Sequence, residues 1–498
     1  MSEKELRLGF KGKEEKHKVD VPDGAPEPWG VDADLAVVGK DHPRVDAVLK
    51  VTGQAKYAYD MQPEGLAYAK LVGSPHAHAR VKKVDLSRAK KLEGVLFTEA
   101  HEGKTVRFAG DVVAGVVAET EEILDDAIRL IEVEYEVLDH VVTVEAAQKQ
   151  GAPAVKRGTA NVVFGRRGRQ GNMKAAQAAH RDADVKLTRV YRTQVQTHCC
   201  LETHGSVSAW NGKKLTVWAS TQGTFSVRNS IARQLRIPQS DVTVITEHMG
   251  GGFGSKHGVD RWDVFAARAA REIGRPVHAM LDRKADHLVA GNRPSSIQRC
   301  VFSANKDGTL LGAEVHSWGT GGVGGGAGVF NPGIYKFKNS ARISADVYTH
   351  AGRARAFRTP RFPQGVFALE GMIDEIAEAI DMDPLALRKK NDPSEVRQAQ
   401  YKIGANEIGW DRRRKKPGSD KGPVKGGLGM ASTLWYHTGR AGSIVKCRIE
   451  KDGSVLVANG AQDIGTGTRT VMAIIAAEEL GLKPAQIEVR LGNTTDGM

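Results

Sequence analysis

The sequence predicts an α/β (α+β) protein assembled from several domains. Its 498 residues correspond to about three domains. Short apolar segments of strand character, such as GDVVAGVVAE, stand beside longer segments of helical periodicity, such as WDVFAARAAREI. Hydrophobic residues make up 40% of the chain and charged residues 26%, which is typical of globular proteins and excludes a mostly disordered chain.

Charge and cysteine content narrow the function. Lys and Arg number 72 against 59 Asp and Glu, and the formal net charge of +13 favours an anionic ligand, a nucleic acid or an acidic partner. The cysteines form no CxxC pair, so this chain has no cysteine set for an iron–sulfur cluster. Because neither a leader nor an apolar run of about 18 residues is visible, we expect a cytoplasmic protein without a membrane span.

The N-terminal part divides into three predicted regions. Residues 1–43 are charged and then rich in Pro and Gly, and we expect an N-terminal arm that is extended or disordered. Residues 44–150 predict a small α/β domain with short strands and a helix in EEILDDAIRLIEVEYE. Residues 151–178 are basic and contain Gly, which predicts a connector.

The largest predicted domain covers residues 179–410 and has core-facing helices in WDVFAARAAREI and VFALEGMIDEIAEAI. The second of these helices would turn Glu370, Asp374 and Glu378 outward. Residues 411–427 combine a charge run with Pro and Gly and predict an exposed linker. Nucleic acid could bind there, but no aromatic residue interleaves the charges as a stacking platform would need, so we expect no nucleic acid as a partner.

Residues 428–498 open a further αβ unit that repeats part of the preceding domain. Gly223 precedes a helix and then the strand VTV, and Gly467 precedes a helix and then the strand IEV at nearly the same spacing. The echo predicts two homologous modules that face each other across a shared site, with the second module incomplete.

Glycine loops carry the sharpest chemical signal. The segment HMGGGFGSKHG, residues 248–258, lies between an expected strand and an expected helix, where glycines let backbone N–H groups approach an anion. It is not a P-loop, because the GK[ST] ending is missing. RARAFRTPRFPQG, residues 353–365, offers several guanidinium groups, and AQDIGTGT, residues 461–468, is a further glycine turn before a helix. Structural turns and a solvated basic loop are the alternatives, but three such loops favour one extended anionic ligand.

The segment QTHCCLETHG, residues 196–205, gathers His, Cys and Glu side chains and raises the question of a metal site. A zinc site usually draws its ligands from more than one element. We therefore predict burial or supporting hydrogen bonds for these residues and no direct metal ligand from protein side chains.

These motifs together resemble the large, molybdopterin-binding subunit of the xanthine dehydrogenase and aldehyde oxidase family, the molybdenum hydroxylases. VTGQAKYAYD, SPHAHARV and VRFAGDVVAGVVAET are similar to its small α/β-hammerhead domain. THCCLETHG, STQGTFSVRNSIA, MGGGFGSK, RAFRTPRFPQG and QDIGTGT are similar to the motifs that line its molybdenum cofactor. The resemblance implies a hammerhead domain at 44–150, a first molybdopterin-binding domain at 179–410 and the start of a second at 428–498.

The resemblance also implies residue roles. Gln222, Phe253 and Arg358 are the expected catalytic residues, with Gln222 hydrogen-bonded to the oxo ligand of molybdenum and Arg358 on the loop beneath the metal. The expected cofactor-binding residues are Gln222, Gly251, Gly252, Phe253, Gly254, Arg358, Gly465, Thr466 and Gly467. The cofactor would be molybdenum–molybdopterin, alone or as its cytosine dinucleotide, and the dithiolene sulfurs of the cofactor would hold the metal.

This sequence departs from the family pattern at three points. The Gly-Glu motif of the family's general-base glutamate has no match in this chain. His257 follows the glycine loop where purine-oxidising members have an acidic residue, which disfavours xanthine, and Pro360 stands where an aromatic clamp is expected. His257 and Pro360 are therefore candidates for the substrate pocket, and an aldehyde or an N-heterocycle is the expected small-molecule substrate.

The leading hypothesis is a molybdenum hydroxylase large subunit that passes electrons to an iron–sulfur subunit and an FAD subunit. A truncated chain, a split subunit completed by a second chain, and a non-catalytic relative kept for cofactor binding or assembly are the explanations we weigh for the missing glutamate.

Overall fold

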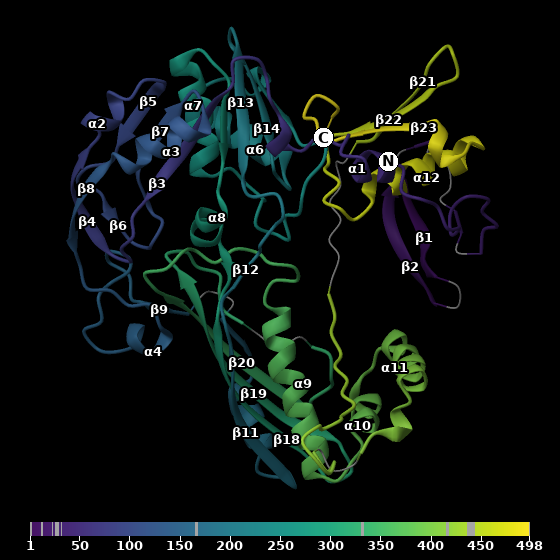
Figure 1. Ribbon diagram of the computed structural model, residues 1–498. Coiled ribbons are helices and arrows are strands. Elements are labelled where there is room, and N and C mark those ends of the chain that lie inside the picture. The colour runs from purple at the N-terminus through teal and green to yellow at the C-terminus, as the bar shows by residue number, and fades with distance from the viewer. Residues whose placement is uncertain are drawn as a thin grey trace.

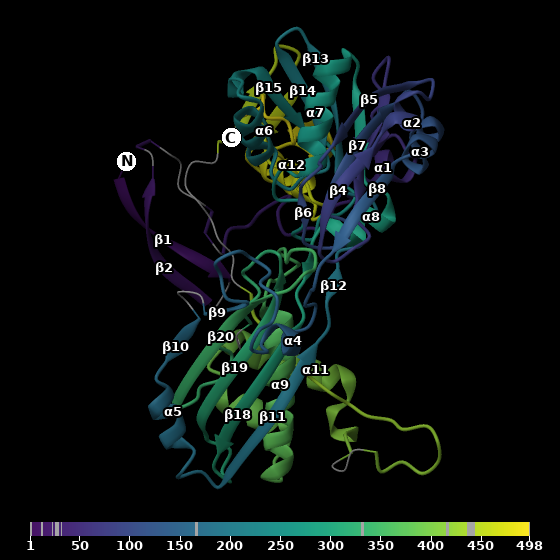
Figure 2. The same ribbon diagram turned by 90° about the vertical axis from the view of Figure 1, so that its left-hand side faces the viewer.

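A computed structural model describes residues 2–10, 13–21, 23–24, 29–30, 32–164, 168–329, 333–414, 418–435 and 444–497. Figure 1 shows an upper part that contains the N-terminal α/β region, a lower part built around a long sheet, and a smaller C-terminal part beside the upper one. In Figure 2 the helix α12 (Thr468–Leu480) lies behind α6 (Thr224–Leu235). A β-bridge between Ile245 and Asn493 shows that the two expected modules are neighbours.

The upper part holds a seven-stranded sheet in the order β15-β14-β13-β16-β3-β7-β5. The strands are β3 (Ala67–Gly73), β5 (Val95–Ala100), β7 (Val112–Ala118), β13 (Gly205–Asn211), β14 (Lys214–Ala219), β15 (Val242–Ile245) and β16 (Val277–Met280). β3 and β16 pair in parallel through two residues each, so one sheet runs from the predicted small domain into the predicted main domain. Within this sheet, the two domains are therefore joined by a short strand pairing.

Two helices cover this sheet close to the expected site. α6 packs Val227 and Ile231 on β14 and β15, and α7 (Arg261–Ile273) buries Phe265 and a row of alanines against β13 and β16. A reciprocal capping box of Asp260 and Asp263 begins α7, and Gly274 ends it in the left-handed conformation that favours glycine. α7 thus matches the predicted segment WDVFAARAAREI.

The N-terminal α/β region corrects one predicted helix. The helix expected in EEILDDAIRLIEVEYE ends early, because α3 covers Glu121–Arg129 and the next residues form β8 (Glu132–Val137). β8 pairs with β4 (Ala79–Asp85), which also pairs with β6 (Thr105–Val106). Alternating Val and Tyr in EVEYEV fit a half-buried strand better than a helix. Short helices complete the region at α1 (Ala47–Val51), η1 (Ala58–Asp60), α2 (Ser87–Lys90) and α4 (Val144–Ala147).

The lower part is a six-stranded sheet in the order β10-β20-β19-β18-β11, with β9 paired to β20. Its strands are β9 (Val162–Val163), β10 (Arg169–Gly171), β11 (Val185–Thr193), β18 (Ser296–Ala304), β19 (Leu310–Gly322) and β20 (Asn339–Tyr348). β9 and β10 lie within 151–178, so the stretch expected as a connector contributes two strands to this sheet. The helix α5 (Met173–Ala179) follows at the end of this stretch.

α9 (Phe362–Ala379) packs on β11 and β18 and forms the core of the lower part with Leu369, Met372 and Ile376. Glu370 was expected to face outward, but it is buried and accepts hydrogen bonds from the fully buried Arg388 at 2.8 and 2.9 Å. Asp374 and Glu378 are exposed as predicted. A buried carboxylate needs a buried cation as partner, and Arg388 comes from the next helix, α10 (Pro384–Asn391), so helical periodicity could not reveal it.

The C-terminal part repeats the module of β13, β14, α6 and β15. β21 (Lys446–Ile449) pairs antiparallel with β22 (Val455–Asn459), α12 follows, and β23 (Ile487–Leu491) lies parallel to β22. The 3₁₀ turns η2 (Gln239–Asp241) and η4 (Pro484–Gln486) precede β15 and β23, respectively. This agreement in order and direction confirms the predicted echo. The modules touch through an antiparallel bridge between Ile245 and Asn493.

The N-terminal residues form a paired hairpin in place of the expected extended or disordered arm. β1 (Ser2–Phe10) and β2 (Lys13–Val21) form a hairpin whose cross-strand pairs include Lys16–Glu5 at 2.6 Å and Lys18–Glu3 at 2.7 Å. Opposite charges across two strands stabilise pairing without apolar periodicity, the signal that was absent from the sequence. Further along, Glu478 of α12 accepts hydrogen bonds from the backbone N–H groups of residues 36–38, which fixes this segment to the second module.

The remaining elements are α8 (Arg283–Val289), α11 (Glu395–Ile408), η3 (Trp410–Arg412), β12 (Gln196–Thr197) and β17 (Asn292–Arg293). The described part of the predicted linker 411–427 has no strand and no helix beyond η3, and Lys415–Pro417 in its charge run lie outside the described residues. In the part of the chain that the structure describes, no helix combines the length and the apolar character needed to span a bilayer.

Candidate functional site

A cavity of about 1490 Å³ opens where the two modules and the loop before α9 meet, and we call it the central cavity. The predicted site residues that line it are Gln222, Gly251, Phe253, Gly254, His257, Arg358, Pro360, Gly465 and Thr466. Gly252 and Gly467 are not among the lining residues but stand next to residues that are. Segments more than 200 residues apart in the sequence thus contribute to one cavity.

Gln222 is held in one orientation at the start of α6. Its Oε1 accepts hydrogen bonds from the backbone N–H groups of Gly254 at 2.8 Å and of Lys256 at 3.4 Å. The backbone N–H of Gln222 donates to the backbone oxygen of Lys256 at 2.7 Å. Because Oε1 must accept from the loop, the side-chain NH₂ is left as a donor at the cavity wall.

The segment 248–258, which we call the glycine loop, has backbone angles that few residues other than glycine adopt. Gly251 and Gly254 have φ angles of 95° and 105°, and Phe253 between them has a positive φ of 50°. A Cβ on Gly252 would lie 2.6 Å from Gln222 Oε1, and a Cβ on Gly254 would lie 2.6 Å from Ala356 O. The loop therefore needs glycine both for conformation and for close approach to its neighbours.

A buried ionic cluster fixes the loop from behind. The Lys256 ammonium, whose residue is 2% exposed, donates to Ser220 Oγ at 2.6 Å and to Glu202 O at 2.8 Å and lies 3.8 Å from the Glu202 carboxylate. Glu202 Oε2 in turn accepts from Gly250 N–H at 2.8 Å. Burial lowers the pKa of Lys256 and the Glu202 charge opposes that shift. The cluster connects the loop to β14 and to the segment before β13.

His204 forms a second support for the same loop. Its Nδ1 lies 2.7 Å from Asp286 Oδ1 and its Nε2 lies 2.9 Å from Ser255 Oγ, which donates to Gly252 O at 2.8 Å. Burial lowers the pKa of His204 although the neighbouring Asp286 raises it. The Asp–His–Ser order resembles a nucleophilic triad, but Ser255 is 1% exposed and its hydroxyl is used by the loop, so the arrangement supports the backbone.

The segment 353–365, which we call the arginine loop, forms part of the cavity wall and has a strained backbone. Arg358, Thr359 and Arg361 have positive φ angles of 21°, 57° and 76°. The N–H of Arg358 donates to Phe253 O at 2.8 Å, which joins this loop to the glycine loop. Arg293 donates to Arg358 O at 2.9 Å and lies 4.5 Å from the Phe357 ring centroid. Strain of this kind persists only where surrounding contacts impose it and is frequent at functional sites.

Asp260 links the arginine loop to α7. Its carboxylate pairs with Arg353 at 2.5 Å and with Arg355, which also donates to Ser255 O of the glycine loop. Burial raises the pKa of Asp260, and the Arg355 guanidinium opposes that shift. Of the arginines of the predicted motif, Arg353 and Arg355 pair with Asp260, whereas Arg355, Arg358 and Arg361 stand in the wall of the central cavity.

The second module contributes the turn before α12. The Asp463 carboxylate accepts hydrogen bonds from the N–H groups of Gly465, Gly467 and Arg469 at 2.9, 3.1 and 3.1 Å. Arg44 donates to Gly465 O at 3.0 Å and lies 3.7 Å from Asp463. These hydrogen bonds from three N–H groups lower the pKa of Asp463 against the effect of its burial. The turn is thus shaped by one carboxylate and presents Gly465 and Thr466 to the cavity.

The residues of the segment 196–205 make supporting hydrogen bonds to the loops of the site, as predicted. His198 Nε2 lies 2.7 Å from Ala356 O, and Glu202 and His204 support the glycine loop as described above. Cys199 lines the cavity, with its Sγ 3.3 Å from His287 Nε2. The segment 198–204 forms no strand, because β13 begins at Gly205 and Cys199 has a positive φ of 48°.

Sequence reasoning missed several residues of the site. Arg293, Trp435 and Ile464 line the cavity, and Asp463 and Arg44 shape the turn before α12. Asp463 stands inside the AQDIGTGT motif as an acidic residue ahead of a helix, the usual signal of a capping residue. Arg293 and Arg44 follow no motif pattern, because their roles depend on tertiary contacts. His257 lines the cavity, where burial lowers its pKa.

Comparison with known proteins places this geometry in a family. Residues 155–392 match the molybdopterin cofactor-binding domain, residues 404–497 match a second model of that description, and residues 52–102 match the a/b hammerhead domain of aldehyde oxidase and xanthine dehydrogenase. The aldehyde oxidoreductase molybdenum-binding subunit PaoC of Escherichia coli is 31% identical over 503 residues, which cover 93% of this chain and 66% of that protein. The chain thus spans about two thirds of the length of that relative.

A second relative and a solved structure agree with this result. The nicotinate dehydrogenase large molybdopterin subunit of Eubacterium barkeri is 30% identical over 386 residues, which cover 72% of this chain and 90% of that protein. The crystal structure of the Cu,Mo-CO dehydrogenase shares the fold with a TM-score of 0.79 at 22% identity and covers 93% of this chain and 69% of its own. The chain therefore belongs to the aldehyde oxidase and xanthine dehydrogenase family, as one of its molybdopterin-binding subunits.

Proposed function

We propose that this chain is the molybdopterin-binding subunit of a molybdenum hydroxylase that acts on an aldehyde or an N-heterocyclic carbon with water as the oxygen source. The observation that carries the proposal is the convergence of Gln222, the glycine loop, Arg358 and the Gly465 turn on one cavity. Hydrogen bonds join Gln222, the glycine loop and the loop of Arg358, and the cavity that these segments leave with the Gly465 turn suits one large ligand.

The residues present fit a molybdopterin. The central cavity of about 1490 Å³ is large enough for an extended cofactor, and the Cβ positions of Gly252 and Gly254 would already be filled by neighbouring atoms. When bound, the cofactor supplies a metal that accepts two electrons and activates water-derived oxygen. The Arg358 and Arg361 guanidiniums in the cavity wall suit its anionic phosphate groups.

The residues of this chain then bind and orient the cofactor and the substrate. The Gln222 NH₂ group donates toward the cofactor from a position fixed by two backbone hydrogen bonds. Phe253, which is 43% exposed, presents its ring into the cavity from the glycine loop. His257 and Pro360 limit the substrate space, and Pro360 leaves room where an aromatic ring would stack.

Partner subunits complete the proposed enzyme. The relatives carry the names molybdenum-binding subunit and large molybdopterin subunit, which supports a multi-subunit assembly here. We propose an iron–sulfur subunit and an FAD subunit as electron acceptors, since this chain has no cysteine set for a cluster. A cytoplasmic location remains a prediction.

A second chain that completes the molybdenum domain has its own support. β13 in the first module pairs on its outer side with β16, whereas the matching edge of β21 pairs with no strand among the residues that the structure describes. Val471 and Ile475 on α12 are 50% and 47% exposed. We propose that this second chain pairs with β21, covers α12 and carries the general-base carboxylate that the motifs of this sequence do not contain.

The test is oxygen transfer in the assembled complex. The subunits are co-purified from a molybdopterin-producing host, and incorporation of ¹⁸O from labelled water into the product of an aromatic aldehyde is measured. Gln222→Glu keeps an acceptor for the Gly254 N–H and removes the donor, so we expect a loss in kcat of about 100-fold. Asn229→Asp, the same chemical change on the exposed side of α6, should leave kcat unchanged.

A cofactor-binding or assembly protein without turnover is the other candidate, and it is favoured by the missing glutamate motif. A wild-type complex that holds molybdenum but forms no ¹⁸O-labelled product from any aldehyde or N-heterocycle in labelled water would support that candidate and contradict the hydroxylase.

A further inference from the structure

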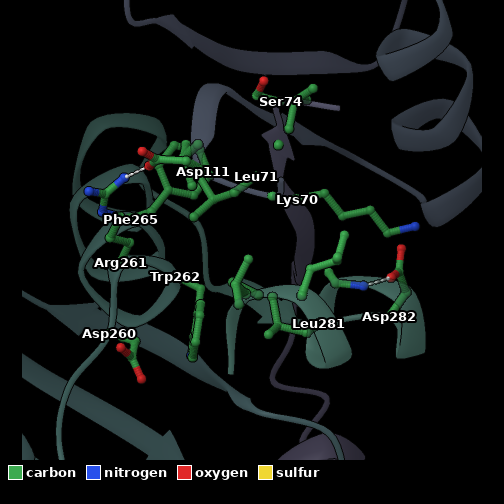
Figure 3. A pocket seen from close by; sticks show the side chains of 18 of the residues that line it. Lys70, Leu71, Ser74, Asp111, Asp260, Arg261, Trp262, Phe265, Leu281 and Asp282 are labelled. Atoms are coloured by element: carbon green, nitrogen blue, oxygen red, sulfur yellow. Dashed lines mark hydrogen bonds and ion pairs between the residues drawn. The ribbon is translucent and has the colours of Figure 1, made fainter. Parts of the chain in front are cut away.

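A second cavity, of about 860 Å³, lies at the seam between the small N-terminal domain and the first module, and we call it the junction cavity. Figure 3 shows it between Leu71 of β3 and the following Ser74 on one side and Trp262, Leu281 and Asp282 on the other. The junction cavity and the central cavity share no lining residue. It therefore needs an explanation of its own.

The cavity exists because two parallel strands separate. β3 and β16 are paired only at Ala67–Val277 and Tyr68–His278, and the lining begins with the next residue of each strand, Ala69 and Ala279. Beyond this point β3 has a strand partner on the β7 side alone. A crevice at the carboxyl ends of diverging parallel strands is a usual place for ligands in α/β proteins.

Its walls are mainly apolar. Leu71, Phe108, Trp262, Leu281 and Leu288 line it, and Leu288 is 36% exposed although it stands in a cavity. The volume falls within the range of small-molecule sites, about 300–1,000 Å³. An apolar body of modest size would gain favourable burial here.

The charged residues of the wall carry a small excess of cations, because Lys70, Arg261, Lys284 and Arg353 stand against Asp111, Asp260 and Asp282. Buried Asp111 pairs with Arg261 at 2.8 Å and with Lys104 at 2.7 Å, and Asp260 pairs with Arg353 and Arg355. Lys104 and Arg355 lie outside the lining, so each of these two carboxylates is also neutralised from outside the cavity. Figure 3 shows the Asp111–Arg261 pair at the edge of the cavity.

Arg261 is the best placed anchor among these cations. Its side chain is 61% exposed, and of its five N–H donors the contact with Asp111 uses one nitrogen, Nη1. The spare donors form the fork that binds a carboxylate in a bidentate manner. Lys104 still neutralises Asp111 when Arg261 turns to a ligand.

We propose that the junction cavity binds a small organic carboxylate, with the carboxylate on Arg261 and an apolar body against Trp262, Leu281 and Leu288. The site is separate from the cofactor, and the inference does not depend on the proposed catalytic function.

The probe is benzoate, titrated into the full chain by isothermal titration calorimetry. Wild type should bind it saturably. Arg261→Gln should weaken binding about tenfold, the expected loss of a charge-assisted hydrogen bond. Arg271→Gln, a substitution on the same helix at an exposed residue outside the cavity, should change nothing. Ala285→Leu, which fills the cavity from α8, should abolish binding.

Two further measurements locate the ligand and its charge. Benzamide, the neutral analogue, should bind at least about tenfold more weakly than benzoate. Arg358→Ala in the central cavity should leave benzoate affinity unchanged. The proposal is overturned if wild type shows no saturable binding, if Ala285→Leu binds as wild type does, or if Arg358→Ala is the variant that loses the ligand.

Discussion

The first and second modules have the same strand order and the same helix placement, yet they hold their cofactor-facing turns in different ways. In the first module the glycine loop rests on buried Lys256, Glu202 and His204, and α7 with β16 closes the sheet beyond β13. In the second, Asp463 shapes the turn, and no strand pairs with the outer edge of β21 among the described residues. The two modules thus share a fold, but the first gives the cavity a wall fixed by buried contacts and the second gives it a wall with fewer supporting contacts.

The difference indicates that the first module positions reactive groups and that the second module contacts another chain. A buried, fully hydrogen-bonded cluster fixes atoms to fractions of an ångström, as positioning of a reactive group requires. An open strand edge and exposed Val471 and Ile475 suit a surface that another chain covers. We expect substitutions in the first module to affect stability directly, and matching substitutions in the second to have smaller effects on this chain alone.

The largest expected effect is at Lys256. Lys256→Met leaves the Glu202 carboxylate buried beside Ser220 without its cation, and breaking a buried ion pair in this way costs about 3–5 kcal/mol of unfolding free energy. Urea denaturation of the purified chain measures it. Lys213→Met at an exposed turn is the control, with a change below about 0.5 kcal/mol. A cost at Lys256 no larger than at Lys213 would contradict the description of the first wall as fixed by buried contacts.

A pair of isoleucines compares the two helices directly. Ile231 of α6 is fully buried, and Ile231→Ala should cost about 2–5 kcal/mol. Ile475 of α12 is 47% exposed, and Ile475→Ala should cost less than about 0.5 kcal/mol in this chain alone. Equal costs in the same denaturation assay would show that the second helix is as well covered as the first.

The turn before α12 should show an intermediate effect. Asp463→Ala removes the acceptor of three backbone N–H groups, and leaving hydrogen-bonding groups of this kind unpaired costs about 1–3 kcal/mol. Amide hydrogen exchange should report faster exchange confined to the turn and α12. Faster exchange that extends into α6 and the glycine loop would mean that the two modules unfold as one unit.

The last effect is a pH dependence of stability that arises in the first module and is spread over about three pH units. Burial raises the pKa of Asp263 to about 7 from an ordinary value of 3.8. The folded state then holds a proton that the unfolded state releases, so this stabilising contribution is present below pH 3.8 and is lost as the pH rises toward 7. The slope from this group is at most about 1.4 kcal/mol per pH unit. Asp263→Asn should flatten the stability profile between these values, and an unchanged profile would contradict the assignment.

Much of the fold follows from local sequence signals. Periodicity places α7 and α12, and the glycine and threonine turns mark where both modules begin their helices. The predictions that were wrong concern residues whose partners lie on another element. The periodicity of α9 alone predicts an outward Glu370, but this residue pairs with Arg388 of another helix and is buried. The β1–β2 hairpin depends on charge pairs across strands, which apolar periodicity does not register.

The candidate site shows the same division. The glycine loop, Gln222 and the arginine loop were accessible because their residue types and spacing carry chemistry and a family resemblance. Arg44, Arg293 and Asp286 were not, since each acts through a tertiary contact with a residue far away in sequence. The junction cavity had no sequence signal, because it depends on where two strands cease to pair.

The molybdenum and pterin content of two glycine variants tests the central claim most directly. A Cβ on Gly252 would lie 2.6 Å from Gln222 Oε1, whereas a Cβ on Gly258 at the end of the same loop would meet no atom within 4 Å. We predict that wild type and Gly258→Ala, purified with their partner subunits, contain stoichiometric molybdenum and pterin, and that folded Gly252→Ala contains little of either. Equal contents in Gly252→Ala and wild type, or none in wild type, would contradict a cofactor held between the two modules.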